Sequence, residues 1–260
     1  MMEDKRNMAS HVQSVAHAIQ ILELIADENR EMSLTEIAQR MNWPKSTVHG
    51  LLSTLRDFSF VEQSPINGRY NLGIRLFELG HLVAKGWDVR AAALPYMQQF
   101  SRLYDLTVQL AMEEQGEVLY IEKIDSVRPT HIVSEAGIRL PIHCSGLGKV
   151  LLAYKSDADA KRILNKSGMP RMTRRTITTL PSMEQELKKV REQGYAVDDR
   201  EIMDSLRCIA APIMDRNGHV RYAISCSGLA ESLNGGSFEQ VLKHLLEMAK
   251  NISSSLGYQK

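Results

Sequence analysis

The segment from residue 33 to residue 72 carries three local signals in a fixed order. Ser33-Leu34-Thr35-Glu36 is a capping box, in which the serine hydroxyl and the glutamate carboxylate satisfy backbone N–H groups where a helix begins. Pro44 suits the first position of a further helix, because its missing N–H would have no intrahelical partner there. Asn67-Gly68 tolerates positive φ and separates two short β-prone stretches, 60–63 and 69–72, so it predicts a hairpin. Two helices and a hairpin in this order leave few folds open.

Apolar periodicity adds a helix before these elements and another after them. The first covers residues 14–27 and has an apolar stripe at helical spacing, formed by Val15, Ala18, Ile19, Leu22, Ile25 and Ala26. The inward positions of the next two helices are expected at Ile37, Ala38 and Met41, and at Val48, Leu51, Leu52 and Leu55. Three helices followed by a hairpin predict a winged helix-turn-helix. A helix over residues 74–85 should link it to the second half, with Ile74, Phe77, Leu82 and Val83 placed for packing.

The helix that begins near Pro44 has a polar outer face suited to DNA. Its outward positions hold Lys45, Ser46, Thr47, His49 and Ser53. Short hydroxyls and a lysine near a helix N-terminus can donate to phosphates and base edges without blocking close approach. Arg69, in the hairpin, is expected to reach a backbone phosphate or the minor groove. These six residues are the predicted DNA contacts.

The charge balance leaves an alternative open. Residues 1–80 contain 8 Lys and Arg against 10 Asp and Glu, a balance of −2, and the whole chain has a net charge of +1. A DNA-binding domain is usually more basic. The helical module could therefore bind protein instead, as part of a cytoplasmic sensing or scaffold protein. The order of capping box, proline-started helix and hairpin favours DNA.

Residues 88–260 mix helices and strands without the regular alternation of a βαβ fold. Helices are expected over 89–106, 182–193 and 238–256, and strands over 107–112, 118–124, 131–134, 195–198, 209–214 and 221–227. Pro95 predicts a kink or a late start in the first of these helices. The pattern predicts an α+β domain with an antiparallel sheet.

The glycine-rich stretch His143-Cys144-Ser145-Gly146-Leu147-Gly148-Lys149 admits more than one interpretation. It is not a phosphate-binding P-loop, because His143 and Val150 occupy the places of the required Gly and Ser or Thr. It is either a turn that starts a helix over 149–154, or a helix start whose N–H groups bind a carboxylate. The two interpretations are compatible.

Several classes of protein are disfavoured by what the sequence lacks. The three cysteines, Cys144, Cys208 and Cys226, form no C-x-x-C motif, and no apolar run is long enough to span a membrane. The first residues lack the apolar core of a secretory signal. Neither a nucleophile elbow nor a His-Glu-x-x-His motif is present. We expect a cytoplasmic protein that is not an enzyme and that uses no metal or cofactor.

Several stretches of the sequence resemble the IclR family of bacterial transcriptional regulators. They include Leu34-Thr35-Glu36-Ile37-Ala38, Lys45-Ser46-Thr47-Val48-His49-Gly50-Leu51-Leu52, Arg69-Tyr70-Asn71-Leu72-Gly73 and Leu76-Phe77-Glu78-Leu79-Gly80, besides residues 14–22. The resemblance covers nearly the whole chain and is closest to regulators of sugar-acid catabolism. The chain departs from the family at Gly50, where Arg is usual, and at Ser59, where Gly is usual. Gly50 puts one phosphate or base contact in doubt.

The resemblance implies a GAF-like effector-binding domain and assigns its ligand contacts. They are Ser145, Gly146, Leu147, Asp198, Cys208, Ser225 and Ser227. Strand spacing agrees in part, because residues 225 and 227 share a face and Cys226 points away. Structural alternatives remain: Cys208 as a small core residue, Asp198 as an acceptor of backbone hydrogen bonds, and the two serines as the solvent face of a strand.

The leading hypothesis is a ligand-controlled transcription factor with an α+β fold. Its predicted parts are a winged helix-turn-helix DNA-binding domain over residues 1–73, a linker helix over 74–87 and a GAF-like effector-binding domain over 88–260. The expected partners are a double-stranded DNA operator and a small carboxylate effector, such as a keto acid or a sugar acid. A homodimer is expected from the fold, and the resemblance implies a dimer of dimers.

Overall fold

The computed structural model describes residues 12–85, 88–127 and 135–259. The chain divides into two compact units between Gly86 and Trp87, and each unit is described by itself. The strand expected over residues 131–134 lies outside the described residues. No helix in the described ranges is both long enough and apolar enough to cross a membrane.

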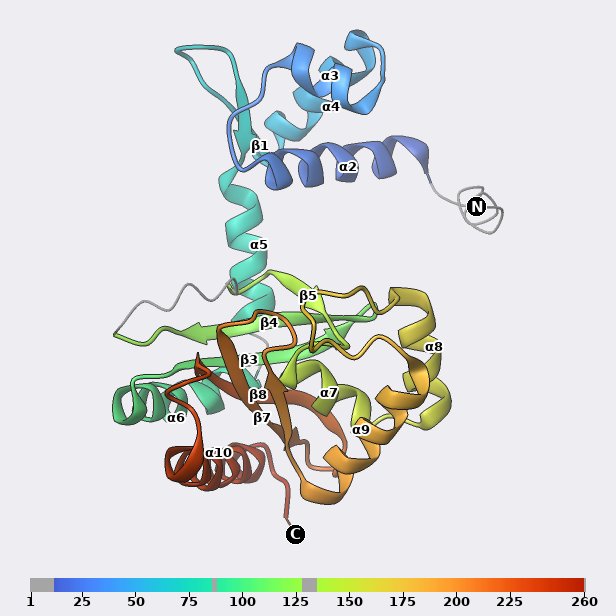
Figure 1. Cartoon of the computed structure of the whole chain (residues 1–260). Helices are drawn as coiled ribbons and strands as arrows, with labels where there is room; N and C mark the ends of the chain where they lie inside the picture. Colours follow the sequence, from blue (N-terminus) through green and yellow to red (C-terminus); the bar gives the residue numbers. More distant parts are fainter. Residues whose placement is uncertain (1–11, 86–87, 128–134, 260) are drawn as a thin grey trace. The chain divides into compact units, whose positions relative to one another are not determined.

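The N-terminal unit has the predicted order of helices and hairpin (Figure 1). Its elements are α2 (Gln13–Glu28), α3 (Leu34–Met41), α4 (Lys45–Asp57), β1 (Val61–Gln63), β2 (Tyr70–Leu72) and α5 (Ile74–Lys85). The two strands pair antiparallel, with Glu62 opposite Asn71. One core joins helices and hairpin, and its buried members are Ile21, Ile25, Met32, Ile37, Ala38, Val48, Leu52, Val61 and Tyr70. The predicted winged helix-turn-helix is confirmed.

The start of α3 is the capping box that the sequence predicts. The Ser33 hydroxyl accepts the N–H of Glu36 at 3.3 Å, and the Glu36 carboxylate accepts the N–H of Ser33 at 2.7 Å. This backbone hydrogen bond is the main cause that lowers the pKa of Glu36 to about 2. Pro44 stands one place earlier than expected, because α4 begins at Lys45. The proline carbonyl still accepts the N–H of Val48 at 3.2 Å, so the proline fixes the entry into α4.

The turn between α4 and β1 requires a residue with positive φ. Ser59 adopts this conformation, with φ of 61°, where the family usually has glycine. Its carbonyl accepts the N–H of Arg75 at 3.1 Å, and a Cβ added at Gly73 would lie 2.2 Å from that same oxygen. This close packing fixes the hairpin to the start of α5. In the hairpin loop, Gly68 has the positive φ (71°) and Asn67 does not.

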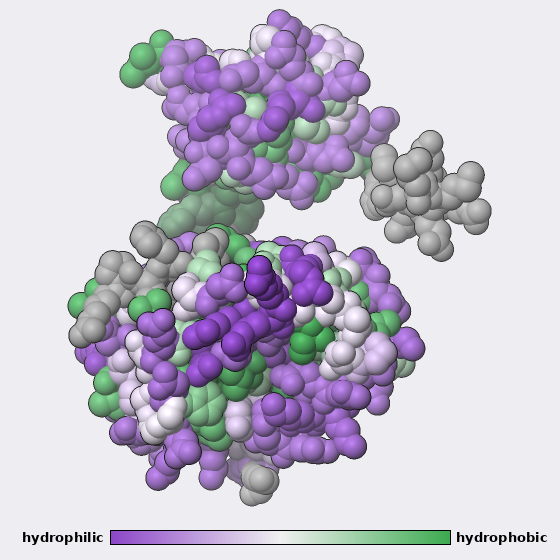
Figure 2. Space-filling model, viewed as in Figure 1, coloured by the Kyte–Doolittle hydropathy of each residue, from purple (hydrophilic) through white to green (hydrophobic). Residues whose placement is uncertain are grey.

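Apolar side chains expected to pack on α5 are exposed within this unit. The exposed fractions of Ile74, Phe77, Leu82 and Val83 are 56%, 70%, 62% and 57%, and the part of α5 that is visible in Figure 2 is mostly coloured as hydrophobic. On α2, Val15 and Ile19 are likewise exposed, because Ile21 and Ile25 face the core instead. The predicted stripe on α2 therefore points only partly inward.

The C-terminal unit is a six-stranded antiparallel sheet between two layers of helices (Figure 1). Its elements are α6 (Asp88–Tyr104), β3 (Thr107–Glu114), β4 (Glu117–Ile124), β5 (Arg139–Pro141), α7 (Gly146–Ala153), α8 (Asp157–Ser167), α9 (Leu180–Gln193), β6 (Ala196–Asp199), β7 (Leu206–Met214), β8 (Val220–Leu229) and α10 (Gly235–Ser255). The strand order is β5-β4-β3-β8-β7-β6. Helices α6 and α10 cover one face, and α7, α8 and α9 cover the other. The predicted α+β architecture is confirmed.

Side chains alternate between the two faces of this sheet. On β8, Ile224 and Cys226 join the core beneath α6 and α10, whereas Ala223 joins the core beneath α7 and α9. On β3, Val108 and Leu110 also face α6 and α10. Residues 225 and 227 therefore face the layer that contains α7.

Some boundaries differ from those expected. Helix α7 begins at Gly146, three residues before the predicted start, because Ser145 caps it. Helix α6 begins at Asp88 and continues through Pro95, so it has no late start. The sequence pattern does not reveal β5 or α8. Strand β5 has only three residues, and α8 buries only Ala160, Ile163 and Leu164, too few for a clear stripe.

Gly50 lies inside α4, and a Cβ added there meets no atom within 4 Å. Gly50→Ala should therefore raise the free energy of unfolding of the N-terminal unit by up to about 1 kcal/mol, because alanine loses less backbone entropy in a helix. Urea unfolding followed by the fluorescence of Trp43, in a Trp87→Phe background, measures this. The matched control, Gly73→Ala, should destabilise the same unit because its Cβ meets the Ser59 carbonyl. A loss of stability in Gly50→Ala would contradict the prediction.

Candidate functional site

A cavity of about 250 Å³ lies between the sheet and the start of α7 in the C-terminal unit. It brings together all seven residues assigned to ligand contact, namely Ser145, Gly146, Leu147, Asp198, Cys208, Ser225 and Ser227. Most of the remaining lining side chains are apolar, among them Met172, Ile202 and Leu206, and no sequence motif indicates them. The cavity thus has one polar wall and one apolar wall. Contact of these residues with a ligand stays a prediction.

Strand register builds the polar wall. Asp198 on β6 is opposite Cys208 on β7, and Cys208 is opposite Ser227 on β8. Ser225 shares the face of Ser227, while Cys226 between them points into the core beneath α6 and α10. Both serines are 1% exposed, so the alternative that they form a solvent face is wrong.

Gln109 is a member of this wall that sequence reasoning missed. The hydroxyls of Ser225 and Ser227 donate to its Oε1 at 3.0 Å and 2.8 Å. A polar residue inside the apolar strand β3 was the only signal for it. Ser227 Oγ also lies 3.0 Å from Cys208 Sγ, and burial raises the pKa of the Cys208 thiol well above its usual range. Within the described ranges, no group of three His, Cys, Asp or Glu side chains is placed to hold a metal ion.

Helix α7 begins in the wall of the cavity. The Ser145 hydroxyl accepts the N–H of Gly148 at 3.0 Å. A Cβ added at Gly148 would lie 1.9 Å from the carbonyl oxygen of Ile142, so packing alone requires this glycine. Gly146 and Leu147 line the cavity itself. The glycines thus start a helix, as one interpretation held, and this start lies where the carboxylate-binding interpretation needs it.

Asp198 is completely buried in the polar wall. Its Oδ1 accepts the N–H of Glu201 at 2.7 Å, as the structural alternative to ligand contact held. Its Oδ2 has no hydrogen-bond partner among the described residues. Burial is the main cause that raises the pKa of Asp198 to about 7, and the charge of Glu201 adds to it. This carboxyl group is therefore near its titration midpoint at neutral pH.

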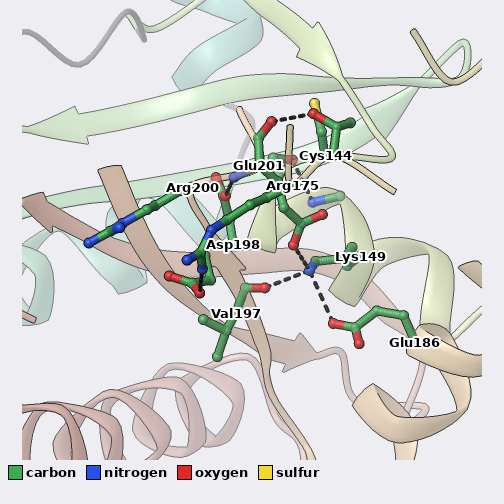
Figure 3. A network of polar contacts seen from close by, with 12 residues as sticks. Cys144, Lys149, Arg175, Glu186, Val197, Asp198, Arg200 and Glu201 are labelled. Carbon is green, nitrogen blue, oxygen red and sulfur yellow. Dashed lines mark hydrogen bonds and ion pairs between the residues drawn. The ribbon is translucent and has the colours of Figure 1, made fainter. Parts of the chain in front are cut away.

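Lys149 on α7 is a buried cation behind the cavity, 1% exposed. Its ammonium donates to Glu201 and to the Val197 carbonyl at 2.5 Å each, and to Glu186 at 3.1 Å (Figure 3). Burial alone lowers the pKa of Lys149, but the charges of Glu201 and Glu186 outweigh it and leave the pKa raised. This network, defined as Lys149, Glu186 and Glu201, ties α7 to α9 and to the segment that follows β6.

The segment after β6 closes one side of the cavity, where Ile202 contributes to the lining. Thr176 donates to the Glu201 carbonyl at 2.7 Å, and Thr173 donates to the Arg200 carbonyl at 2.6 Å. Arg200 has a positive φ of 65°, a conformation that costs a non-glycine residue free energy. These hydrogen bonds and the Lys149 network hold the strained segment in place.

The outer face of α4 in the N-terminal unit is open to solvent. Lys45, Ser46, Thr47 and His49 are exposed, and Ser53 is half-buried. None of these side chains is used to build the core of the unit. The face is therefore accessible to a macromolecule, as DNA contact requires.

Arg69 differs from the other five predicted DNA contacts. Its Nη2 donates to the Glu36 carboxylate at 2.6 Å, and its Nε donates to the Glu31 carbonyl at 3.2 Å. It therefore joins the hairpin to the capping box of α3. The sequence did not reveal this pair, because Arg69 and Glu36 are far apart in the chain. Contact of Arg69 with DNA stays a prediction.

Comparison with protein families decides the identity of the chain. A model described as the IclR helix-turn-helix domain matches residues 14–65, and one described as the bacterial transcriptional regulator IclR C-terminal matches residues 81–254. The chain belongs to the IclR family. This confirms the resemblance seen in the sequence and makes the cavity part of the effector-binding domain of an IclR-family regulator.

Relatives align with this IclR-family chain over almost its whole length. The HTH-type transcriptional regulators XynR and KdgR of Escherichia coli are 34% and 35% identical over 247 residues, which cover 95% of this chain and 98% and 94% of theirs. An IclR homologue from Microbacterium hydrocarbonoxydans, solved in complex with 4-hydroxybenzoate, has a TM-score of 0.83 at 27% identity and covers 94% of this chain and 98% of that one. The family consists of DNA-binding transcriptional regulators rather than enzymes, as predicted, and the scaffold alternative is not supported.

Lys149→Met should lower the free energy of unfolding of the C-terminal unit by about 3–5 kcal/mol. The reason is that methionine leaves the buried carboxylate of Glu201 and the half-buried carboxylate of Glu186 without their cation. Urea unfolding at pH 7, followed by far-ultraviolet circular dichroism, measures the loss. Lys155→Met is the matched control, because Lys155 pairs with Glu113 while about a third exposed, and it should cost at most about 1 kcal/mol. Equal losses in the two variants would disprove a special role for the buried cation.

Proposed function

We propose that this chain binds operator DNA through α4 and the hairpin, and that a small organic acid in the cavity controls that binding. The observation that carries the proposal is the polar wall of the cavity. A carboxylate there meets the start of α7, and a neighbouring hydroxyl or keto group meets Ser225 and Ser227. The volume of about 250 Å³ lies below the roughly 300–1,000 Å³ of pockets that hold drug-sized molecules, which favours a small metabolite.

A relative supports the chemical class of this ligand. The Microbacterium hydrocarbonoxydans homologue holds 4-hydroxybenzoate, a molecule with one carboxylate and one hydroxyl group. The present cavity has a helix start that suits a carboxylate, two serine hydroxyls that suit a ligand hydroxyl group, and an apolar wall beside them. Sugar acids and keto acids carry the same pairing of a carboxylate with an oxygen function. We therefore assign the effector to the small carboxylates.

The proposed DNA contacts are Lys45, Ser46, Thr47, His49 and Ser53 on α4, together with Arg69 of the hairpin. Lys45 is the first residue of α4, where the helix dipole adds to its attraction for a phosphate. Arg69 is 33% exposed and keeps its link to Glu36 while it approaches the duplex. Gly50 offers no side chain at a position where the family usually has Arg, so base preference should depend on the remaining residues.

We also propose that the DNA-binding units act in pairs. The exposed apolar side chains of α2 and α5, such as Ile19 and Phe77, are suited to a symmetric contact with a second copy. A dimer places two copies of α4 on two half-sites of a near-palindromic operator, and two dimers give a tetramer. The effector acts if it binds more tightly to one spacing of these units than to another.

Lys45→Ala should weaken binding to duplexes from the promoter next to this gene and flatten the dependence of log K on log salt by about one unit. The reason is the loss of one phosphate contact. Fluorescence anisotropy titrations between low and moderate salt measure both quantities. Lys161→Ala on α8 is the matched control and should leave the slope unchanged. If the parent chain binds no promoter duplex at low salt, the DNA-binding proposal fails. If the slope of log K against log salt is unchanged in Lys45→Ala, Lys45 makes no phosphate contact.

Ser225→Ala should abolish the change in DNA affinity that a bound carboxylate causes, while DNA affinity without ligand stays intact. The reason is that the variant loses one hydroxyl of the cavity wall, whereas the residues proposed to contact DNA are unchanged. Ser253→Ala, which removes a buried hydroxyl of α10 outside the cavity, should keep the response. The same titrations with and without 4-hydroxybenzoate or D-gluconate provide the measurement. A full response in Ser225→Ala would exclude this wall as the ligand site.

A further inference from the structure

The carboxyl group of Asp198 contributes an unpaired oxygen to the cavity wall. The residue is 0% exposed and lines the cavity. Oδ1 is occupied by the N–H of Glu201, whereas Oδ2 makes no hydrogen bond of ordinary length and angle with the described residues, and the Ile202 N–H and the Cys208 thiol interact with the carboxyl group only weakly. A buried charged oxygen without a donor is costly. Oδ2 is therefore free to accept a hydrogen bond from a ligand or to hold a proton of its own.

The charges around Asp198 give a bound anion no cation to pair with. The part of the cavity lining that the structure describes contains no Lys, Arg or His. Lys149 faces Asp198 from α7, but its ammonium already donates hydrogen bonds to Glu186, Glu201 and the Val197 carbonyl (Figure 3). With both carboxyl groups ionised this network carries a net charge of −1, and burial raises the pKa of Glu201, so the network has no positive charge to spare for a ligand.

The other titratable groups facing Asp198 add no positive charge. They are Tyr120 on β4, Cys144 in the turn before α7 and Cys208 on β7, and burial raises the pKa of each, so they stay neutral. Arg175 pairs with Asp199, the next residue on β6, whose side chain points to the other face of the strand. A carboxylate that entered beside an ionised Asp198 would meet a second negative charge, with the start of α7 as the main positive feature of the cavity lining. Two carboxyl groups that share such a site retain one proton between them.

We propose that Asp198 meets the carboxylate of the effector as a neutral carboxylic acid, so that binding takes up one proton. This rests on the proposed function, because it requires a carboxylate in the cavity. The proton comes from solvent and remains covalently bound to Oδ2. The resulting O–H group donates a hydrogen bond to an oxygen of the ligand carboxylate. An O–H···O⁻ hydrogen bond of this kind is short and stronger than one between neutral groups. Asp198 then contributes to specificity by selecting an anion without using a cation.

The ionisation of Asp198 agrees with this arrangement. Burial chiefly raises its pKa to about 7, the charge of Glu201 raises it further, and the N–H groups of Glu201 and Ile202 and the Lys149 charge oppose the rise. A bound anion raises it again. Below this pKa the free protein already holds the proton, so affinity should not depend on pH. Above it, affinity should fall about tenfold per pH unit, because a carboxylate ligand with a pKa near 4 stays ionised throughout.

Isothermal titration calorimetry of the full chain at pH 6.5 and pH 8.5 tests the proposal. The probes are 4-hydroxybenzoate, D-gluconate and 2-oxobutanoate, with 4-hydroxybenzamide as the uncharged counterpart of the first. For a carboxylate that binds, the dissociation constant should rise at least about tenfold between the two pH values. Titrations at pH 8.5 in two buffers with different ionisation enthalpies should show uptake of nearly one proton per site. The benzamide should show neither effect.

Two isosteric variants separate Asp198 from its surroundings. Asp198→Asn carries a permanent N–H donor toward the cavity, so it should bind the carboxylate with the same affinity at both pH values and take up no proton. Asp199→Asn, on the same strand but outside the cavity lining, should keep the tenfold loss of the parent chain. Circular dichroism at both pH values confirms that each variant is folded.

The outcomes distinguish this proposal from the one on which it rests. Carboxylate binding with equal affinity at both pH values, or proton uptake that persists in Asp198→Asn, overturns the role of Asp198 and leaves a carboxylate-controlled regulator intact. Tighter binding of the benzamide than of 4-hydroxybenzoate at pH 6.5, or no carboxylate binding at either pH, overturns both. A pH effect that disappears in Asp198→Asn and remains in Asp199→Asn supports both.

Discussion

The arrangement of the C-terminal unit depends on one buried ammonium group. Lys149 extends from α7 and meets a carboxylate from α9, a carboxylate from the segment after β6 and a carbonyl of β6 itself. Burying three charged groups gains little stability overall, because desolvation offsets their attraction. Their geometry is nevertheless demanding, since each group is left uncompensated in any other packing of these elements. The start of α7, β6 and the segment after β6 also line the cavity, so this contact helps to fix the position of that part of its wall.

The two units differ in how far local sequence determines them. In the N-terminal unit, the capping box at Ser33 and the proline before α4 act within a few residues of their own positions, and the hairpin loop contains the glycine it needs at Gly68. These elements were predicted nearly to the residue. In the C-terminal unit, β5 has three residues and pairs with a strand more than ten residues earlier. Nothing in its own composition marks it as a strand, so tertiary pairing alone defines it.

The residues predicted to be functional divide in a similar way. The seven cavity residues followed from family motifs, and the spacing of Ser225 and Ser227 alone already placed both on one face. Gln109 was missed because it is 116 residues from Ser225, and Glu201 because it is 52 residues from Lys149. Arg69 was correctly placed in the hairpin, but its pairing with Glu36 depends on how the hairpin folds back on α3. Contacts between distant segments carry no signal in a single sequence.

The hydrogen bonds of the two serines decide what one wall presents to a ligand. Both hydroxyls are within hydrogen-bond distance of the same amide oxygen of Gln109, and Ser227 Oγ also lies 3.0 Å from Cys208 Sγ, so the hydroxyl hydrogens have partners in the wall and the lone pairs remain for the interior of the cavity. An alcohol can donate to these lone pairs directly, whereas a ketone oxygen would first have to draw a hydrogen away from the glutamine. At this position the wall therefore presents hydrogen-bond acceptors rather than free donors to the interior of the cavity.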